Sequence, residues 1–62
     1  MTQVAESSIR PGLFLEGTGT HRVQVVVVRI EGKRALCRLV RSGGEKWIAL
    51  KTLSTAYRGI DR

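Results

Sequence analysis

Apolar and polar residues alternate with a period of two along the middle of the chain, which is the pattern of β-strands. β-Branched residues are dense between Val23 and Ile30, which favours strand over helix. Glycine-containing turns at 31–33 and 42–45 divide this region. The predicted strands are Leu13–Glu16, His21–Ile30, Arg34–Arg41, Lys46–Leu50 and a short strand near Tyr57.

Residues 51–54 are expected to form one turn of 3-10 helix before the last strand. Residues 1–9 are polar and without a period, so we expect a flexible N-terminal tail followed by one domain over 10–62. Five short strands in a chain of this size would expose long edges as an open meander. The pattern therefore predicts an all-β protein whose five strands close into a small barrel.

Alternation also assigns the strands' two faces. The predicted inner residues are Val26, Val28, Ile30, Ala35, Cys37, Leu39, Ile48, Leu50 and Leu53. The predicted outer residues are Val23, Val25, Val27, Arg29, Arg34, Leu36, Arg38, Val40, Trp47, Ala49 and Lys51. Two alternatives stay open: a bulge in the second strand would move some valines inward, and Trp47 folded over a barrel end would cap the core.

The outer face combines an indole, several aliphatic side chains and four cations, and exposed apolar patches of this extent usually mark an interaction site. The whole chain carries 11 Lys and Arg against 5 Asp and Glu, a net charge of +6. Residues 1–20 contribute one Arg and two Glu, and residues 21–62 contribute ten basic and three acidic residues, or +7. A basic surface in the folded part is typical of proteins with a polyanion partner.

The residues for catalysis or metal binding are missing. The chain has one His and one Cys, so we expect no catalytic relay, metal site, cofactor or small-molecule substrate. Cys37 lies in an apolar run and is expected to be a buried thiol. No apolar run approaches the roughly 18 residues of a membrane span. These features predict a non-enzymatic cytoplasmic protein without a membrane partner.

The order of elements resembles the SH3-like small barrels of the Tudor and KOW type. The residues that carry the resemblance are Leu13 to Glu16, Val25 to Glu31, Gly32, Ala35 to Val40 and the stretch EKWIALKTL from Glu45 to Leu53. The chain is also similar to short basic proteins encoded by phages of actinobacteria, which would place it in the host cytoplasm. Barrels of this group bind DNA, RNA, ribosomal components, methylated tails or proteins, so the resemblance implies a binding module without choosing its partner.

Two functional hypotheses follow. In the first, the chain binds nucleic acid, DNA rather than RNA, as a duplex and with little sequence specificity; the contacts would come from Arg29, Arg34, Arg38, Trp47 and Lys51. In the second, the outer face is a protein interface, for a homodimer or for docking onto a host protein. Its residues would be Val25, Val27, Leu36, Val40 and Trp47.

Overall fold

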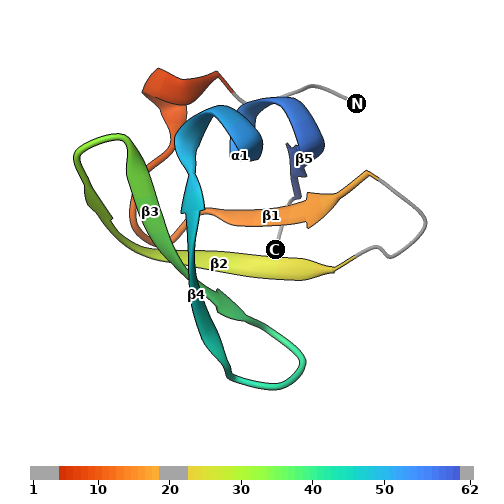
Figure 1. The fold of residues 1–62 in the computed structure, drawn as a ribbon. Helices are drawn as coiled ribbons and strands as arrows, with labels where there is room; N and C mark the ends of the chain where they lie inside the picture. Colours follow the sequence, from red (N-terminus) through yellow and green to blue (C-terminus); the bar gives the residue numbers. More distant parts are fainter. Residues whose placement is uncertain (1–4, 19–22, 61–62) are drawn as a thin grey trace.

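The computed structural model describes residues 5–18 and 23–60, in which five strands form one antiparallel sheet (Figure 1). The strands are β1 (Phe14–Gly17), β2 (Gln24–Glu31), β3 (Arg34–Leu39), β4 (Glu45–Ala49) and β5 (Tyr57–Gly59), in the spatial order β4-β3-β2-β1-β5. A short 3-10 helix, η1 (Glu6–Ser8), precedes β1, and an α-helix, α1 (Leu50–Ala56), joins β4 to β5. The prediction of an all-β chain with five strands is confirmed.

Glycine sets the backbone of both hairpins in the β2–β3–β4 meander. Gly32, between β2 and β3, has φ of 60°, and Gly43, between β3 and β4, has φ of 79°. L-residues with a side chain rarely adopt these angles. A Cβ built at either position meets no atom within 4 Å, so the backbone angle and not a lack of space is what favours glycine there.

An extra residue in β2 determines which valines reach the core. Val27 pairs with Cys37, whereas Leu36 pairs with Arg29, so Val28 is the additional residue of a β-bulge. On the N-terminal side of the bulge, Val27 is 1% exposed and faces the core. On the C-terminal side, Arg29 is exposed.

The prediction that Val25 and Val27 point outward is therefore wrong. Val25 is 0% exposed, and the half-buried Val26 lies opposite the exposed Arg38. Counting back from Arg29 in steps of two assigns the wrong face, because the bulge inserts a residue and reverses the alternation. The bulge that the sequence left open as an alternative is what the structure contains, and it removes both valines from the predicted interface.

The core lies between the inner face of the sheet and α1. It consists of Ile9, Leu15, Val25, Val27, Ala35, Cys37, Ile48 and Leu53, with Ile30, Leu39 and Leu50 among the partly buried side chains packed against it. The inward orientation predicted for residues of β3 and β4 is confirmed by the burial of Ala35, Cys37 and Ile48. These two strands have no bulge relative to each other, so simple alternation holds.

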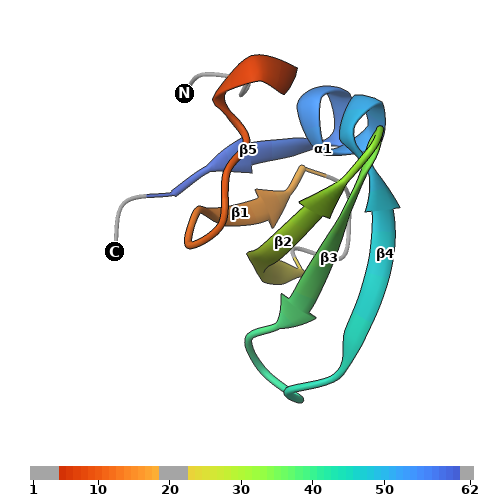
Figure 2. The same cartoon turned by 90° about the vertical axis from the view of Figure 1, so that its left-hand side faces the viewer.

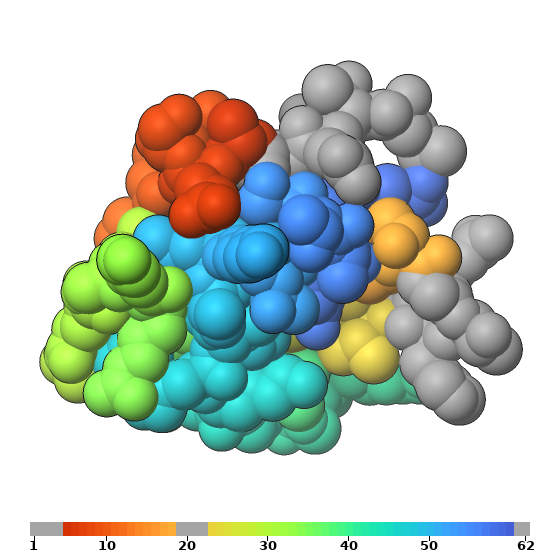
Figure 3. Space-filling view, turned by 45° about the horizontal axis from the view of Figure 1, so that its top comes forward, coloured from red at the N-terminus to blue at the C-terminus, as the bar shows by residue number. Residues whose placement is uncertain are grey.

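Two local predictions need correction. The predicted single 3-10 turn before β5 is a seven-residue α-helix, which places Leu53 in the core at 0% exposure. Ile9, assigned to the N-terminal tail, is 5% exposed and belongs to the core. The η1 segment contacts α1, and Figure 3 shows the two segments (red and light blue) side by side on one face of the molecule.

The sheet is open between its two end strands. In the described residues no ladder joins β4 to β5, and α1 connects these strands across one end (Figures 1 and 2). Closure of the five strands into a barrel, as predicted, is thus not what the structure shows. Over residues 5–18 and 23–60, no helix has the length and apolar character to cross a membrane.

Candidate functional site

The outward side of the β2–β3–β4 meander gathers an indole, three guanidinium groups and two carboxylates. We call this surface the indole face; its residues are Val26, Arg29, Glu31, Arg34, Leu36, Arg38, Glu45, Trp47 and Ala49. The register places Leu36 opposite both Arg29 and Trp47, in the middle of the face. The flanking cross-strand pairs are Arg34 with Ala49 and Arg38 with Glu45.

Trp47 lies between two arginines. The guanidinium carbon of Arg34 is 4.4 Å from the centroid of the indole, and that of Arg29 is 5.6 Å from it. Both distances are within the range of cation–π contacts. Trp47 keeps 38% of its surface exposed, so its ring does not cap the core. The prediction that the indole and these arginines share the outer side of the meander is confirmed.

Two of the arginines on the indole face are also paired with glutamates. Arg29 Nη2 lies 2.8 Å from Glu31, two residues further along β2, and Arg38 Nη2 lies 3.1 Å from Glu45 across β3 and β4. All four side chains are at least 41% exposed, so each ion pair contributes at most about 1 kcal/mol and is readily exchanged for another anion. Among the described residues Arg34 makes no ion pair, although Glu31 lies opposite it on β2.

Lys51 does not extend the indole face along β4 as predicted, because the chain has already entered α1 at Leu50. The backbone N–H of Leu50 donates to the Lys33 carbonyl at 2.9 Å, which brings the start of α1 to the β2–β3 hairpin. Lys33 and Lys51 are both exposed, and neither has an ion pair among the described residues. With Arg34 they make one end of the indole face basic.

The apolar part of the face differs from the predicted one. Leu36 is half-buried, and Val40 is 38% exposed beside Gln24, whose carbonyl accepts the Val40 N–H at 3.0 Å. In place of Val25 and Val27, the outward aliphatic residue of this part of β2 is Val26. Phe14 lies opposite Val26 on β1 and continues the apolar surface toward β5. Its outward orientation follows from the complete burial of its neighbour Leu15, a signal that the alternation of β1 already contained.

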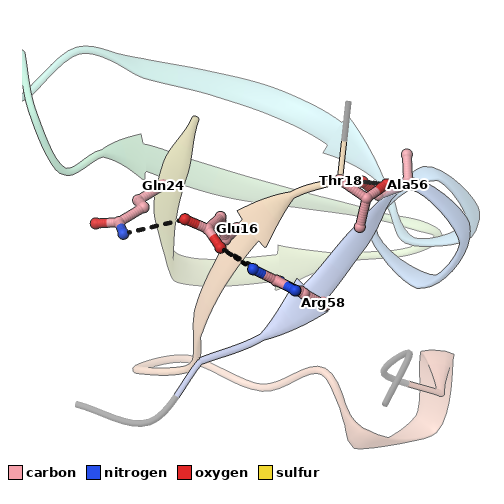
Figure 4. A network of polar contacts seen from close by, with 5 residues as sticks. All are labelled: Glu16, Thr18, Gln24, Ala56 and Arg58. Atoms are coloured by element: carbon pink, nitrogen blue, oxygen red, sulfur yellow. Dashed lines mark hydrogen bonds and ion pairs between the residues drawn. The ribbon is translucent and has the colours of Figure 1, made fainter. Parts of the chain in front are cut away.

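A polar network links β1 to its two neighbouring strands, β2 and β5 (Figure 4). Glu16 accepts two hydrogen bonds from Arg58, at 3.2 Å from Nε and 2.7 Å from Nη2, and one from Gln24 Nε2 at 3.4 Å. The Thr18 hydroxyl donates to the Ala56 carbonyl at 3.1 Å. Arg58 is therefore engaged in holding β5 on β1 and is not one of the cations available to a ligand.

The described residues contain no cluster of metal-ligating side chains, and the single cysteine of the chain lies in the core. Over 5–18 and 23–60 there is no group of three or more His, Cys, Asp or Glu side chains able to hold a metal ion. Burial raises the pKa of the Cys37 thiol above its ordinary value of 9.0, and nearby Lys46 offsets only part of this effect. Cys37 is therefore a neutral core thiol at physiological pH. His21 lies outside the described residues.

Comparison with models of protein families, with curated proteins and with solved structures finds no match to this chain.

Proposed function

We propose that this chain is a non-enzymatic nucleic-acid-binding module of SH3-like architecture, and that the indole face is its contact surface. The strand order β4-β3-β2-β1-β5, with a helical segment between β4 and β5, supports the SH3-like assignment. The observation that carries the functional proposal is the exposed Trp47 between Arg29 and Arg34. An exposed aromatic ring among cations offers a stacking surface for a base and charge for the adjoining phosphates.

The phosphate contacts are proposed to begin at the basic end of the face. Arg34, Lys33 and Lys51 lack acidic partners among the described residues, so they can bind phosphate without first breaking an ion pair. Arg29 and Arg38 would join by exchanging Glu31 and Glu45 for phosphate, which costs little because both ion pairs are exposed.

Double-stranded DNA with little sequence preference is the proposed ligand. Reading base edges in the major groove generally uses a helix or a two-stranded ribbon bearing amide or guanidinium forks. The helix α1 has only seven residues, and Leu53 of this helix is in the core. Apolar side chains on a sheet, such as Leu36 and Trp47, instead suit insertion between base steps in the minor groove.

The proposal is tested by the affinity for a labelled duplex at increasing salt. With about three phosphate contacts, affinity should fall roughly forty-fold between about 50 mM and about 200 mM monovalent salt. Trp47→Ala and Arg34→Gln should each weaken binding several-fold. Lys46→Gln is the matched control, because Lys46 is opposite the inward-facing Cys37 and thus lies on the other side of β4. Equal losses in Lys46→Gln and Arg34→Gln, or affinity indifferent to salt, would contradict the proposal.

A protein partner on the same surface is the second candidate. It is favoured by the half-buried Leu36 opposite the exposed Trp47 and by the half-buried Val26 opposite Arg38, because aliphatic side chains beside an aromatic and arginines are typical of interface hot spots. The salt dependence separates the two candidates: an apolar protein interface would keep its affinity over the salt range in which phosphate contacts are lost.

A further inference from the structure

One edge of the sheet presents a regular row of backbone groups. In an antiparallel ladder, residues alternate between those bonded to the neighbouring strand and those whose N–H and C=O point away from it. The bonds from Leu50 N–H to Lys33 and from Leu39 N–H to Gly44 fix this alternation between β3 and β4. Glu45, Trp47 and Ala49 therefore direct their N–H and C=O groups away from β3.

No described segment pairs with this edge. β4 is the last strand in the sheet order, and Figure 2 shows it on the outside of the meander with no labelled element beyond it. Edge strands are commonly protected by proline, a bulge or inward-pointing charges. β4 has no proline and no bulge, and its one charge on the inner side, Lys46, lies toward the β3–β4 turn and leaves Trp47 to Ala49 uncharged.

We propose that β4 pairs in antiparallel fashion with β4 of a second copy of this chain, about a twofold axis at Trp47. Two β4 strands can form hydrogen bonds only in a register that places residues whose N–H and C=O groups point away from β3 opposite one another. The register centred on Trp47 uses all three: Trp47 faces Trp47, and Glu45 faces Ala49 of the second copy. Each residue then makes the contact that its counterpart makes, as an isologous interface requires.

The neighbouring registers are less favourable. Moving the twofold axis by one residue toward the β3–β4 hairpin places Lys46 directly opposite Lys46 of the second copy. Like charges in directly opposed positions destabilise a sheet. A shift the other way places Glu45 opposite Lys51, which belongs to α1 and cannot continue a strand ladder. The central register avoids both, and two indoles face each other within reach of an aromatic pair contact.

Charge complementarity supports the same pairing. In the central register four residues on the outer face line up across the two copies. Arg38 and Glu45 come from β3 and β4 of one copy, and Ala49 and Arg34 come from β4 and β3 of the other. Ala49 is small, so the Arg34 side chain can pass over it toward Glu45. In a single chain Arg34 makes no ion pair, because Glu31 opposite it pairs with Arg29, and the dimer would bring Glu45 of the second copy within its reach. The interface is one short strand from each copy, so we expect a weak, concentration-dependent dimer.

Ala49→Pro is a sharp test, because proline removes an N–H that only the dimer uses. The φ angle of Ala49 is −62°, close to the value that proline imposes, and its N–H points away from β3. The variant should therefore fold with unchanged circular dichroism. Ala49→Ser, which keeps the N–H at the same exposed position, is the matched control.

Sedimentation without nucleic acid should show a mass rising toward twice the 6.9 kDa of one chain as the concentration increases from about 10 µM to about 1 mM. Ala49→Ser should behave like the original chain and Ala49→Pro should remain a monomer. A monomer throughout for the original chain, or a dimer that survives Ala49→Pro, would overturn the proposal.

Amide hydrogen exchange of the unmodified chain gives a second readout that depends on no substitution. The amides of Glu45, Trp47 and Ala49 should become more protected as the concentration rises, whereas those of Lys46 and Ile48, already bonded to β3, should change little. Protection at these three amides that is independent of concentration would also overturn the dimer. Both measurements are made without DNA, so they separate this proposal from the proposed function.

Discussion

Arg34 and Trp47 are diagonal neighbours on adjacent strands, with the guanidinium carbon 4.4 Å from the centre of the indole. The contact keeps a large aromatic ring at the surface of a small protein, because the planar cation covers part of the ring that water would otherwise contact. The same contact holds Arg34 over the indole, although Glu31 lies opposite Arg34 on β2; Glu31 forms its ion pair with Arg29 instead.

We expect Arg34→Ala to lower the free energy of unfolding by about 0.5–1 kcal/mol, the usual magnitude for an exposed cation–π pair. Trp47 fluorescence should shift at the same time, since the ring loses its covering cation. Urea denaturation measures the first effect. Arg41→Ala, an exposed arginine in the turn after β3, is the control and should change neither quantity. Equal effects in both variants would show that the contact contributes nothing.

The reversed alternation of β2 predicts opposite outcomes for two adjacent valines. Val25→Thr places a hydroxyl in the core and should destabilise the protein by about 1–3 kcal/mol. Val26→Thr makes the same change on the half-buried outer face and should cost less than about 0.5 kcal/mol. Chemical denaturation of the two variants is the measurement. A greater loss for Val26→Thr would mean that the bulge at Val28 is absent.

The strand β2 and its neighbours show how much of the fold can be predicted from the sequence. In β3 Arg34 and Arg38 mark the outer face, and neither β3 nor β4 is bulged relative to the other, so alternation correctly placed Ala35 and Cys37 inside and Trp47 outside. Positions 25 to 28 are all valine, so both faces are apolar there, and the polar residues at the two ends of the run, Gln24 and Arg29, assign opposite faces when counted in steps of two. Gln24 lies before the bulge and Arg29 after it, so only pairing with β3 shows which of the two assigns the faces of Val25 and Val27.

The candidate site was predictable to a similar extent. Trp47, Arg29, Arg34 and Arg38 follow from alternation, and the Arg29–Glu31 pair could have been foreseen because residues two apart in a strand share a face. The Arg38–Glu45 pair required the register of the β3–β4 hairpin. Lys51 was misplaced because residues 50–56 are too few to show the apolar period of a helix. The helix α1 forms there and places Leu53 in the core.

The Glu16–Arg58 pair should contribute more to stability than the exposed pairs of the indole face. Its side chains are only 14% and 23% exposed, and Glu16 accepts two hydrogen bonds from Arg58. We expect Glu16→Gln to lower the free energy of unfolding by about 1–3 kcal/mol. Glu45→Gln, which breaks an exposed pair, should cost less than about 1 kcal/mol. Equal losses in urea denaturation would contradict this ranking.

Cys37 should make the protein less stable in alkali. Its pKa is raised in the folded state, mainly by burial, so the unfolded thiol ionises first, near 9.0. Its stabilising contribution is therefore complete below pH 9.0 and is lost as pH rises from there through the folded pKa. Cys37→Ala should lower stability at neutral pH by leaving a small cavity, and should remove this part of the alkaline decline. Denaturation curves across that range measure both effects; an unchanged decline in the variant would contradict this assignment.

The most direct test of nucleic-acid binding by the indole face is a nuclear magnetic resonance titration of the labelled chain with a generic DNA duplex at low salt. We predict that the Trp47 indole N–H and the amides of Arg34 and Leu36 shift progressively, while Lys46 and Ile48, with side chains on the other side of β4, shift little. The absence of shifts, or shifts centred on Lys46 and the opposite side of the sheet, would contradict the assignment of this face as the DNA-contacting surface.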